Sequence, residues 1–228
     1  MVDQNELKRL AAERAVSLIE SGMVVGLGHG STSLLAVHEL AGRLKRGEVR
    51  DIVAIPCSPE IEAESRKLGI AITTLEEHPN IDLTVDGADE VDPQLNLIKG
   101  GGGALLREKI VAQASAREVI MVDESKLSPM LGTKWAVPVE VLEYGLRSQR
   151  EFIESLGGQP KVRMSGDRPF RTASNNLILD CNFGPIEDPA SLATQLKQRT
   201  GIVEHGLFVG MATEVVVAGT AGVRVLKR

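Results

Sequence analysis

Hydrophobic residues in the first half of the chain follow two alternating patterns. Apolar residues three or four positions apart are typical of amphipathic helices, whereas short and nearly continuous apolar runs are typical of strands buried on both faces. The first pattern predicts helices over residues 6–19, 32–44, 58–69 and 103–116. The second predicts strands over residues 23–27, 51–56, 70–75, 81–85, 95–99 and 118–122. Strands and helices that alternate in this way indicate an open, Rossmann-like and mostly parallel sheet with helices on both faces.

The order of elements changes after about residue 133. Strand and helix patterns then follow in the order strand, helix, strand, strand, helix, strand, which is typical of a ferredoxin-like α+β domain. The corresponding ranges are 135–143, 144–157, 160–164, 176–184, 188–201 and 202–210, with a polar loop at 165–175. Residues 214–226 contain two further strand patterns, which we expect to rejoin the first sheet. We therefore predict a Rossmann-like domain of residues 1–132 plus 207–228 and an inserted domain of residues 133–206.

Composition and charge narrow the classes of function. Hydrophobic residues make up 43% of the 228 residues and charged residues 25%, which is typical of a globular protein with a sizeable core. Because the net charge is −5 and aromatic residues are only 3%, we expect no nucleic-acid partner and no attraction to an anionic membrane. No apolar run approaches the roughly 20 residues that span a bilayer. With a charged N-terminal segment and two isolated cysteines, Cys57 and Cys181, these features predict a cytoplasmic protein with free thiols.

Polar side chains gather directly after three of the predicted strands. They lie in the segments Gly-His-Gly-Ser-Thr at 28–32, Asp-Gly-Ala-Asp at 86–89 and Asp-Glu-Ser-Lys at 123–126. The carboxyl ends of parallel strands meet at one edge of an open α/β sheet, and ligands bind there. We therefore expect residues from these three segments to form one site.

The glycine-rich turn at 28–32 precedes a predicted helix. Backbone N–H groups at such a turn, together with the helix dipole, favour an anion, and Ser31 and Thr32 add hydroxyl groups. A dinucleotide is disfavoured because Ser31 stands where the third glycine of the G-x-G-x-x-G motif belongs and no acidic residue ends the strand at 51–56. A monophosphate fits better, and a tight turn without a ligand is the structural alternative.

A run of glycines at 100–103 separates Lys99 from the helix predicted at 103–116. Such a run packs no side chains and lets a ligand approach the backbone closely, while the lysine ammonium could stabilise a developing oxyanion. On the helix, Glu108 shares a face with small or apolar residues. We therefore expect a partly buried carboxylate, which is a stronger base than a solvated one. The alternative is an exposed glutamate between Arg107 and Lys109.

Asp86 and Asp89 flank Gly87 and allow three interpretations. Their spacing fits an ordinary Asx turn, a metal site, or carboxylates that move protons between neighbouring oxygens and carbons. No histidine lies nearby and the calcium-loop pattern is not satisfied, so the metal interpretation is disfavoured and we expect neither a metal nor a cofactor. Lys126 would add positive charge at the same edge, although a lysine at a strand end is often only a solvated charge.

Taken in this order, the motifs resemble the type A ribose-5-phosphate isomerases over essentially the whole chain, and residues 86–109 are the most specific part. The resemblance implies a metal-independent aldose–ketose isomerase that interconverts ribose 5-phosphate and ribulose 5-phosphate in the pentose phosphate pathway. It also implies a homodimer or homotetramer. The implied catalytic residues are Glu108, which would be the base, Asp86, Asp89 and Lys99. The implied substrate-binding residues are His29, Gly30, Ser31, Thr32, Gly87, Ala88, Gly100, Gly101, Gly102, Lys126 and Lys8. His29 departs from the threonine usual in that family, so the resemblance supports backbone contacts there rather than a side-chain contact.

Two other functions stay open at this level. A non-catalytic sugar-phosphate sensor would need the phosphate-binding turn but no base. Glu108 beside the glycine run disfavours it, as does the lack of a helix-turn-helix pattern. A nucleotide-dependent dehydrogenase would need an acidic residue for the ribose, which the sequence lacks.

Overall fold

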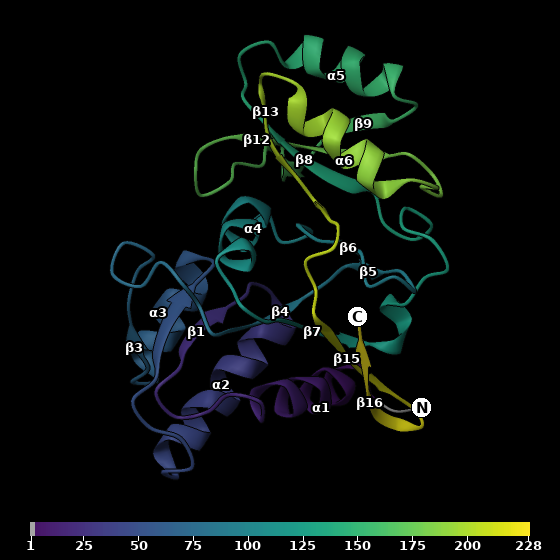
Figure 1. Ribbon diagram of the computed structural model, residues 1–228. Helices are drawn as coiled ribbons and strands as arrows, with labels where there is room; N and C mark the ends of the chain where they lie inside the picture. The colour runs from purple at the N-terminus through teal and green to yellow at the C-terminus, as the bar shows by residue number, and fades with distance from the viewer. Residues whose placement is uncertain (1–2) are drawn as a thin grey trace. The chain divides into compact units, whose positions relative to one another are not determined.

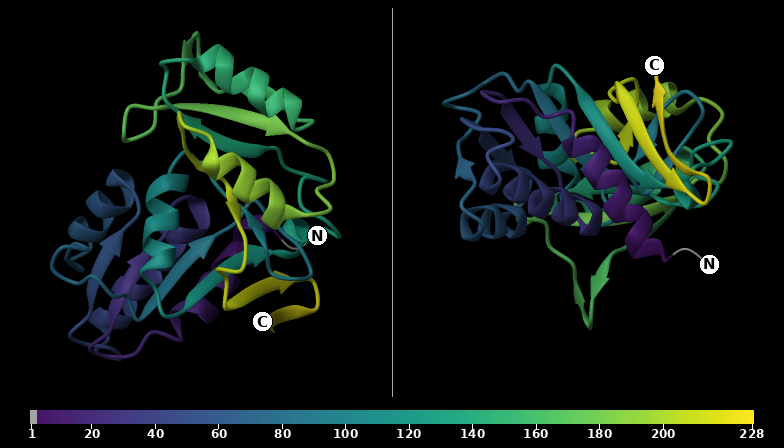
Figure 2. Two further views of the ribbon diagram at one scale, coloured as in Figure 1. Left: turned by 45° about the horizontal axis from the view of Figure 1, so that its top comes forward. Right: turned by 90° about the horizontal axis from the view of Figure 1, so that it is seen from below.

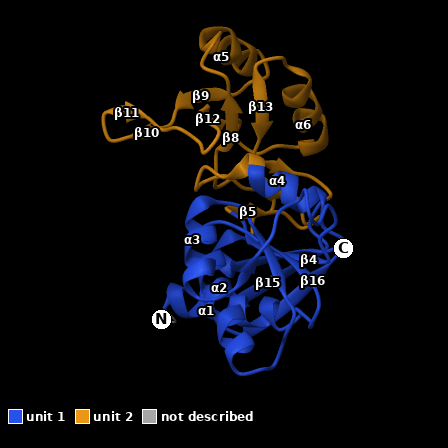
Figure 3. Cartoon of the chain, turned by 90° about the vertical axis from the view of Figure 1, so that its left-hand side faces the viewer, with its two compact units in different colours: residues 1–88, 107–126, 211–228 blue, residues 89–106, 127–210 orange. Residues whose placement is uncertain are grey.

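The computed structural model describes residues 3–228, and this part of the chain divides into two compact units (Figure 3). Unit 1 comprises the described part of residues 1–88 together with residues 107–126 and 211–228. Unit 2 comprises residues 89–106 and 127–210. The predicted domain boundaries differ from this division because they place residues 89–106, 127–132 and 207–210 in the first domain. The assignment of independent domains stays a prediction.

Unit 1 is built on a sheet that, within the described residues, has seven strands in the order β16-β15-β7-β4-β1-β2-β3. All neighbouring pairs are parallel except β15 with β16. This order confirms the predicted Rossmann-like, mostly parallel sheet and the return of the last two strands to it. The strands are β1 Val24–Leu27, β2 Val53–Pro56, β3 Ala71–Ile72, β4 Leu83–Gly87, β7 Glu118–Asp123, β15 Glu214–Gly219 and β16 Gly222–Lys227.

Helices cover both faces of this sheet. Figure 1 shows α1 (Gln4–Val16) beside α2 (Ser31–Lys45), and α1 also packs on β7 and β15. The next helix, α3 (Pro59–Lys67), has proline in its first turn, behind a Ser58 cap. Along β1, Val25 and Leu27 join the core on the α1 and α2 side.

The opposite face of the sheet packs against α4 (Leu105–Gln113), whose residues from Arg107 onward belong to unit 1. Val111 of α4 forms a second cluster with Ile55 and Ile81. Between Val25 and Leu27, a Cβ at Gly26 would lie 2.8 Å from Val111. The alternation of side chains along the strand therefore assigns one face to each set of helices.

The strand order reverses between β1 and β4. Strands β2 and β3 follow β1 towards one edge, whereas β7 and β15 follow β4 towards the other edge. Such a switch point opens a crevice at the carboxyl ends of the two strands, which is where open α/β sheets bind ligands. Residues 28–32 follow β1 and Asp86 lies near the end of β4, so both reach this position.

Unit 2 contains, within the described chain, an antiparallel sheet of four strands in the order β13-β8-β12-β9 and the helices α5 (Leu146–Ser155) and α6 (Pro189–Gln198). Taken in chain order, these elements form the predicted ferredoxin-like arrangement, and Asp188 caps α6. The helices bury Ile153 and Leu196 against Val139 and its neighbours. The strands are β8 Val137–Val141, β9 Gln159–Val162, β12 Leu177–Asn182 and β13 Ile202–His205.

Two smaller structures of unit 2 differ from the sequence prediction. The polar loop forms a hairpin, β10 (Met164–Ser165) with β11 (Arg168–Pro169), which projects from the rest of unit 2 (Figure 2). The strand predicted at 95–99 belongs to a separate antiparallel sheet rather than to the parallel sheet. That sheet contains β5 (Glu90–Val91), β6 (Leu97–Ile98) and β14 (Leu207–Phe208).

The single strand predicted at 202–210 is divided at Gly206. Its first half is β13 of the ferredoxin-like sheet, and its second half is β14. Gly206 N–H donates to the carbonyl of Pro138 at 2.7 Å, and its carbonyl accepts from Lys99 N–H at 2.9 Å. A Cβ at this position would lie 2.2 Å from the Lys99 carbonyl, so the segment needs glycine where it passes from one sheet to the other.

No helix in the described residues is both long and apolar enough to cross a membrane.

Glu214, at the start of β15, is held by two cations, Arg117 directly before β7 and Lys227 at the end of β16. Its carboxylate lies 2.6 Å from Arg117 and 3.4 Å from Lys227. The hydrogen bond from Arg117, which outweighs the opposing effect of burial, and the charges of Arg117 and Lys227 lower the pKa of Glu214. The carboxylate therefore stabilises the edge of the sheet when it is ionised.

We expect Glu214→Gln to lower the free energy of unfolding at pH 7 by about 1 kcal/mol. Because the pKa in the folded state lies below the unfolded value of about 4.3, the stabilisation is present above that value and is lost as the pH falls through the folded pKa. Urea unfolding at pH 7 and near pH 4 measures both effects. Glu62→Gln, which breaks the exposed pair with Arg66, is the control. Equal losses in the two variants at pH 7 would contradict the prediction.

Candidate active site

The turn after β1 approaches the end of β4 very closely. Gly28 N–H donates to the carbonyl of Val85 at 3.0 Å. A Cβ at Gly28 would lie 1.8 Å from Oδ1 of Asp86, so only glycine fits at this position. The sequence of the turn is therefore constrained by the carboxylate beside it.

Asp86 organises the turn through its buried carboxylate. Its side chain is fully buried, and Oδ1 accepts hydrogen bonds from His29 N–H at 3.1 Å, Ser33 Oγ at 3.2 Å and Gly87 N–H at 2.7 Å. Hydrogen bonds to the ionised form offset the cost of burying a carboxylate. Asp86 thus ties the end of β4 to the turn after β1, a structural contribution that the sequence does not reveal.

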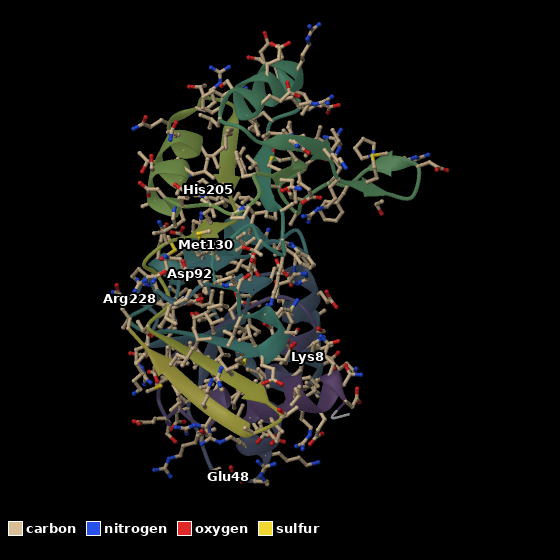
Figure 4. The ribbon with its side chains drawn as sticks, turned by 90° about the vertical axis from the view of Figure 1, so that its right-hand side faces the viewer. Lys8, Glu48, Asp92, Met130, His205 and Arg228 are labelled. Carbon is tan, nitrogen blue, oxygen red and sulfur yellow. The ribbon has the colours of Figure 1, made fainter. Side chains whose placement is uncertain are left out.

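The start of α2 presents polar groups suited to a phosphate. Gly30 is its N-cap, with a φ of 101° that favours glycine, and makes no side-chain capping bond. The first N–H groups of a helix have no partner inside the helix, and its dipole favours an anion there. Lys8 of α1, labelled in Figure 4, donates from Nζ to Ser31 Oγ at 3.1 Å. The half-buried Thr32 follows. Unit 1 therefore places Lys8 beside Ser31, between Gly30 and Thr32. Their role in substrate binding stays a prediction.

His29 directs its ring away from the helix start that it precedes. Its Nδ1 lies 3.0 Å from Oγ of Ser58, the cap of α3, and 3.8 Å from a carboxylate oxygen of Glu60. The imidazole is therefore held against α3. Its backbone belongs to the turn that faces the switch point.

Glu108 lies in the first turn of α4 with 4% of its surface exposed. The prediction of a buried carboxylate is therefore confirmed, and the exposed alternative is wrong. Arg107 and Ile110 occupy the exposed face of the same helix. The residues that share a face of the helix with Glu108 are small or apolar, which explains why its side chain is buried.

Lys126 ends a short 3-10 helix, Glu124–Lys126, directly after β7. Burial alone would raise the pKa of the neighbouring Asp123. Hydrogen bonds from Ser125 and Gln4, together with the charge of Lys126, outweigh burial and leave the pKa of Asp123 below its usual value. An ionised Asp123 therefore partly balances the ammonium of Lys126, which is half-buried beside the strand end.

Unit 2 brings Asp89 to the glycine run. Asp89 Oδ2 accepts from Gly101 N–H at 2.7 Å, and Asp89 N–H donates to the carbonyl of Ile98 at 2.8 Å. A Cβ at Gly101 would lie 2.8 Å from the carboxylate of Asp89, which explains glycine at this position. Gly101 and Gly102 are exposed, whereas Gly100 is buried.

Lys99 precedes the glycine run and is almost fully buried, with 2% of its surface exposed. Its ammonium lies 5.4 Å from the centre of the Phe208 ring, within range of a cation–π interaction. Its backbone N–H is bound by Gly206. A lysine held in this way is fixed in place and does not belong to the solvated surface.

Two further acids in the same stretch serve the structure. Glu90 is fully buried and accepts hydrogen bonds from the N–H groups of Gly132, Lys134 and Trp135 at 2.9–3.1 Å. Asp92 accepts from the N–H groups of Gln94 and Asn96. Sequence spacing alone does not separate these acids from Asp86 and Asp89, because their partners lie up to 45 residues away.

The described residues contain no cluster of side chains arranged like a metal site. Within residues 3–228, no three histidine, cysteine, aspartate or glutamate side chains are grouped so that they could hold a metal ion. The expectation of a metal-free and cofactor-free reaction stays a prediction.

The fold and these groups define an α/β protein with a glycine-rich turn at the switch point of its sheet and a ferredoxin-like insertion. Residues 53–222 match the family model of ribose 5-phosphate isomerase A, also called phosphoriboisomerase A. The chain belongs to the ribose 5-phosphate isomerase A family.

Known relatives match over nearly the full length. The chain is 56% identical to ribose-5-phosphate isomerase A of Chloroflexus aurantiacus, covering 95% of this chain and 91% of the relative. It is 53% identical to the protein of that name from Desulfatibacillum aliphaticivorans, covering 100% and 99%. The solved ribose 5-phosphate isomerase of Plasmodium falciparum is 42% identical, with a TM-score of 0.95 over 98% of this chain and 99% of that chain. A solved D-ribose-5-phosphate isomerase in complex with phospho-erythronic acid is 38% identical, with a TM-score of 0.98 over the full length of both chains.

We expect Gly28→Ala to lower the free energy of unfolding by about 2 kcal/mol, because the added Cβ overlaps Asp86 and forces the turn to move. Urea unfolding measures the loss. Gly42→Ala within α2 is the control: its Cβ would meet only the flexible end of Arg46, and alanine favours the helix by up to about 1 kcal/mol. Comparable stabilities of the two variants would contradict the close approach of Gly28 and Asp86.

Proposed function

We propose that this chain interconverts D-ribose 5-phosphate and D-ribulose 5-phosphate in the non-oxidative branch of the pentose phosphate pathway. The observation that carries the proposal is the full-length match to relatives named ribose-5-phosphate isomerase A, at up to 56% identity among those given above. The proposed residues come from the turn after β1, the end of β4, the glycine run and α4.

The reaction sets clear requirements for the site. A proton moves between C1 and C2 of the open-chain sugar through an enediolate. The reaction therefore needs one positioned base, groups that stabilise the oxyanion, and an acid that moves protons between O1 and O2. A bound phosphate at the other end of the sugar orients the reacting carbons.

Glu108 is the proposed base that removes and returns the carbon-bound proton. Burial of its carboxylate supports this role, because desolvation disfavours the charged form and makes the group a better proton acceptor. Lys99 and the N–H groups of the glycine run are proposed to stabilise the enediolate. The rigid placement of Lys99 beside Phe208 supports this assignment, since a preorganised charge needs no rearrangement during the reaction.

Asp86 is proposed to assist ring opening and oxygen protonation, and Asp89 to orient hydroxyl groups together with Gly87 and Ala88. The short separation of these residues along the chain supports the proposal that they contact the same substrate. Asp86 and Asp89 are three residues apart, so their Cα atoms cannot be separated by more than about 11 Å. Glu108 is likewise the second residue of unit 1 after the chain leaves unit 2.

The start of α2 is the proposed phosphate site. Lys8 and Ser31 are already 3.1 Å apart, and Gly30 and Thr32 lie beside them, which supports one anion held by all four. Lys126 is proposed to contact the substrate at the same sheet edge. The phospho-erythronic acid bound by the solved relative carries a phosphate at one end and a planar carboxylate at the other, which matches the charges of an enediolate. We expect this chain to bind the same compound.

The assembly and location of the protein are part of the proposal. We propose a homodimer or homotetramer, on the basis of the family resemblance, and a cytoplasmic enzyme, on the basis of the charge and cysteine pattern of the sequence.

We expect the wild-type protein to convert ribose 5-phosphate to the ketose at an unchanged rate after treatment with a chelator. In Glu108→Gln, kcat should fall by about a thousandfold or more, because the amide cannot accept the proton, while binding of phospho-erythronic acid stays measurable. A coupled ketose assay and calorimetry measure the two quantities.

Glu151→Gln is the matched control, because Glu151 is an exposed helical glutamate in α5. It should keep wild-type kcat. A Glu108→Gln enzyme with near-normal kcat would refute the assigned base, and a wild-type protein that binds ribose 5-phosphate without converting it would instead indicate a sensor.

For Lys8→Met, we expect KM for ribose 5-phosphate to rise by about tenfold with little change in kcat, because a remote phosphate contact is lost from the ground state and the transition state alike. The inhibition constant for inorganic phosphate should rise by a similar factor. Arg14→Met, at the other end of α1, is the control. An unchanged KM would exclude Lys8 from the phosphate site.

A further inference from the structure

We infer that Arg163, in the ferredoxin-like part of unit 2, is a positioning residue for the glycine turn at 100–103. It aims the N–H group of Gly102 at the substrate. The inference rests on the proposed function, because it assigns the role of one side chain in stabilising the enediolate of that reaction.

Arg163 contacts two consecutive carbonyl groups of the glycine turn. Its Nη1 donates to the carbonyl of Gly100 at 2.8 Å and to that of Gly101 at 3.0 Å. Only 14% of the side chain is exposed. A planar guanidinium that binds two adjacent carbonyls restrains the orientation of both peptide groups.

Other side chains of unit 2 hold the guanidinium of Arg163 in place. Asp180 on β12 accepts from Nε at 3.0 Å and from Nη2 at 2.5 Å, which is a bidentate pair. The ring of Phe170 lies 5.8 Å from the guanidinium carbon. Phe170 also packs against the turn, because a Cβ at Gly103 would lie 2.4 Å from its ring. Side chains from β12 and the segment 163–170 therefore brace the same turn.

A contact that fixes the direction of a peptide carbonyl also fixes the direction of the N–H group in the same peptide. Each peptide is planar and trans, so its N–H points opposite to its carbonyl. In the peptide that joins Gly100 to Gly101, the carbonyl faces Arg163 and the N–H donates to Asp89. In the next peptide, the Gly101 carbonyl faces Arg163, and the Gly102 N–H must point the other way.

The Gly102 N–H is the group left for a ligand. Gly102 is exposed, and no residue of the described chain accepts a hydrogen bond from its N–H. Preorganised N–H groups of this kind stabilise a negative charge that develops during a reaction. The peptide that joins Gly100 to Gly101 is also held by Asp89 and by the Gly103 N–H, whereas Arg163 makes the one hydrogen bond, among the described residues, to the peptide that joins Gly101 to Gly102. Without Arg163, this second peptide could rotate, because glycine has few steric restrictions.

The test compares Arg163→Met with the wild-type enzyme. We expect kcat to fall by about 10- to 100-fold, with KM for ribose 5-phosphate changed by less than about threefold. Affinity for phospho-erythronic acid should fall together with kcat, while inhibition by inorganic phosphate stays constant. A purely structural defect would lower the fraction of active enzyme and leave these affinities unchanged.

Arg171→Met is the matched control. Arg171 lies in the same unit, pairs with Glu143 at 2.7 Å and donates to a backbone carbonyl, but does not contact the glycine turn. We expect its kcat to stay within about twofold of wild type. In Arg163→Ala, millimolar guanidinium should restore part of the lost kcat, and in Arg163→Lys the loss should be smaller than in Arg163→Met.

The outcomes separate the inference from the proposed function. Normal kcat and normal phospho-erythronic acid affinity in Arg163→Met, beside an active wild-type enzyme, would overturn the role of Arg163 and leave the isomerase assignment standing. An inactive wild-type enzyme would overturn both.

Discussion

The buried carboxylate of Asp86 is the contact on which the arrangement of the polar groups in unit 1 depends. Oδ1 of Asp86 accepts hydrogen bonds from the turn after β1, from the first turn of α2 and from the end of its own strand. These bonds fix the turn at the point where the strand order reverses. The position of the carboxylate also explains why residue 28 is glycine, because a Cβ there would overlap Asp86. At the start of α2, Gly30 makes no side-chain capping bond, and Lys8 lies beside Ser31.

The same physical device recurs in unit 2 with different residues. There Asp89 accepts the N–H of Gly101, and Arg163 binds the carbonyl on the opposite side of the same peptide and the carbonyl of the next peptide. A glycine turn is flexible by itself, so both units combine glycine with charged side chains that fix its peptide groups. In each case these contacts satisfy one side of the turn. This arrangement explains why so many acids and glycines fall in one short stretch: some hold the turns, and others are available for chemistry.

Much of this organisation could be predicted from the sequence because it depends on local patterns. Hydrophobic periodicity indicated both sheets, and the small neighbours of Glu108 along α4 indicated its burial. Contacts between distant residues could not be predicted in this way. A short apolar run such as 95–99 does not reveal which strands it pairs with. Here its partners are the nearby β5 and β14, which lies more than 100 residues later. Arg163 was missed for the same reason, although the polar Arg163 and Asp180 in a strand region with apolar neighbours were a usable signal.

These contacts give the ferredoxin-like part of unit 2 a structural role. One face of its sheet is apolar and packs against α5 and α6 through Val137, Val139 and Val141. Side chains alternate along a strand, so the other face of the sheet carries Asp180 and its partner Arg163. Burial of the first face by two helices makes the sheet rigid, and a rigid sheet can hold a guanidinium in one position against the glycine turn. An insertion that only enlarged the surface would not need a bidentate ion pair at that place. The pair is therefore best explained by the requirement that a flexible turn present its N–H groups in a single orientation.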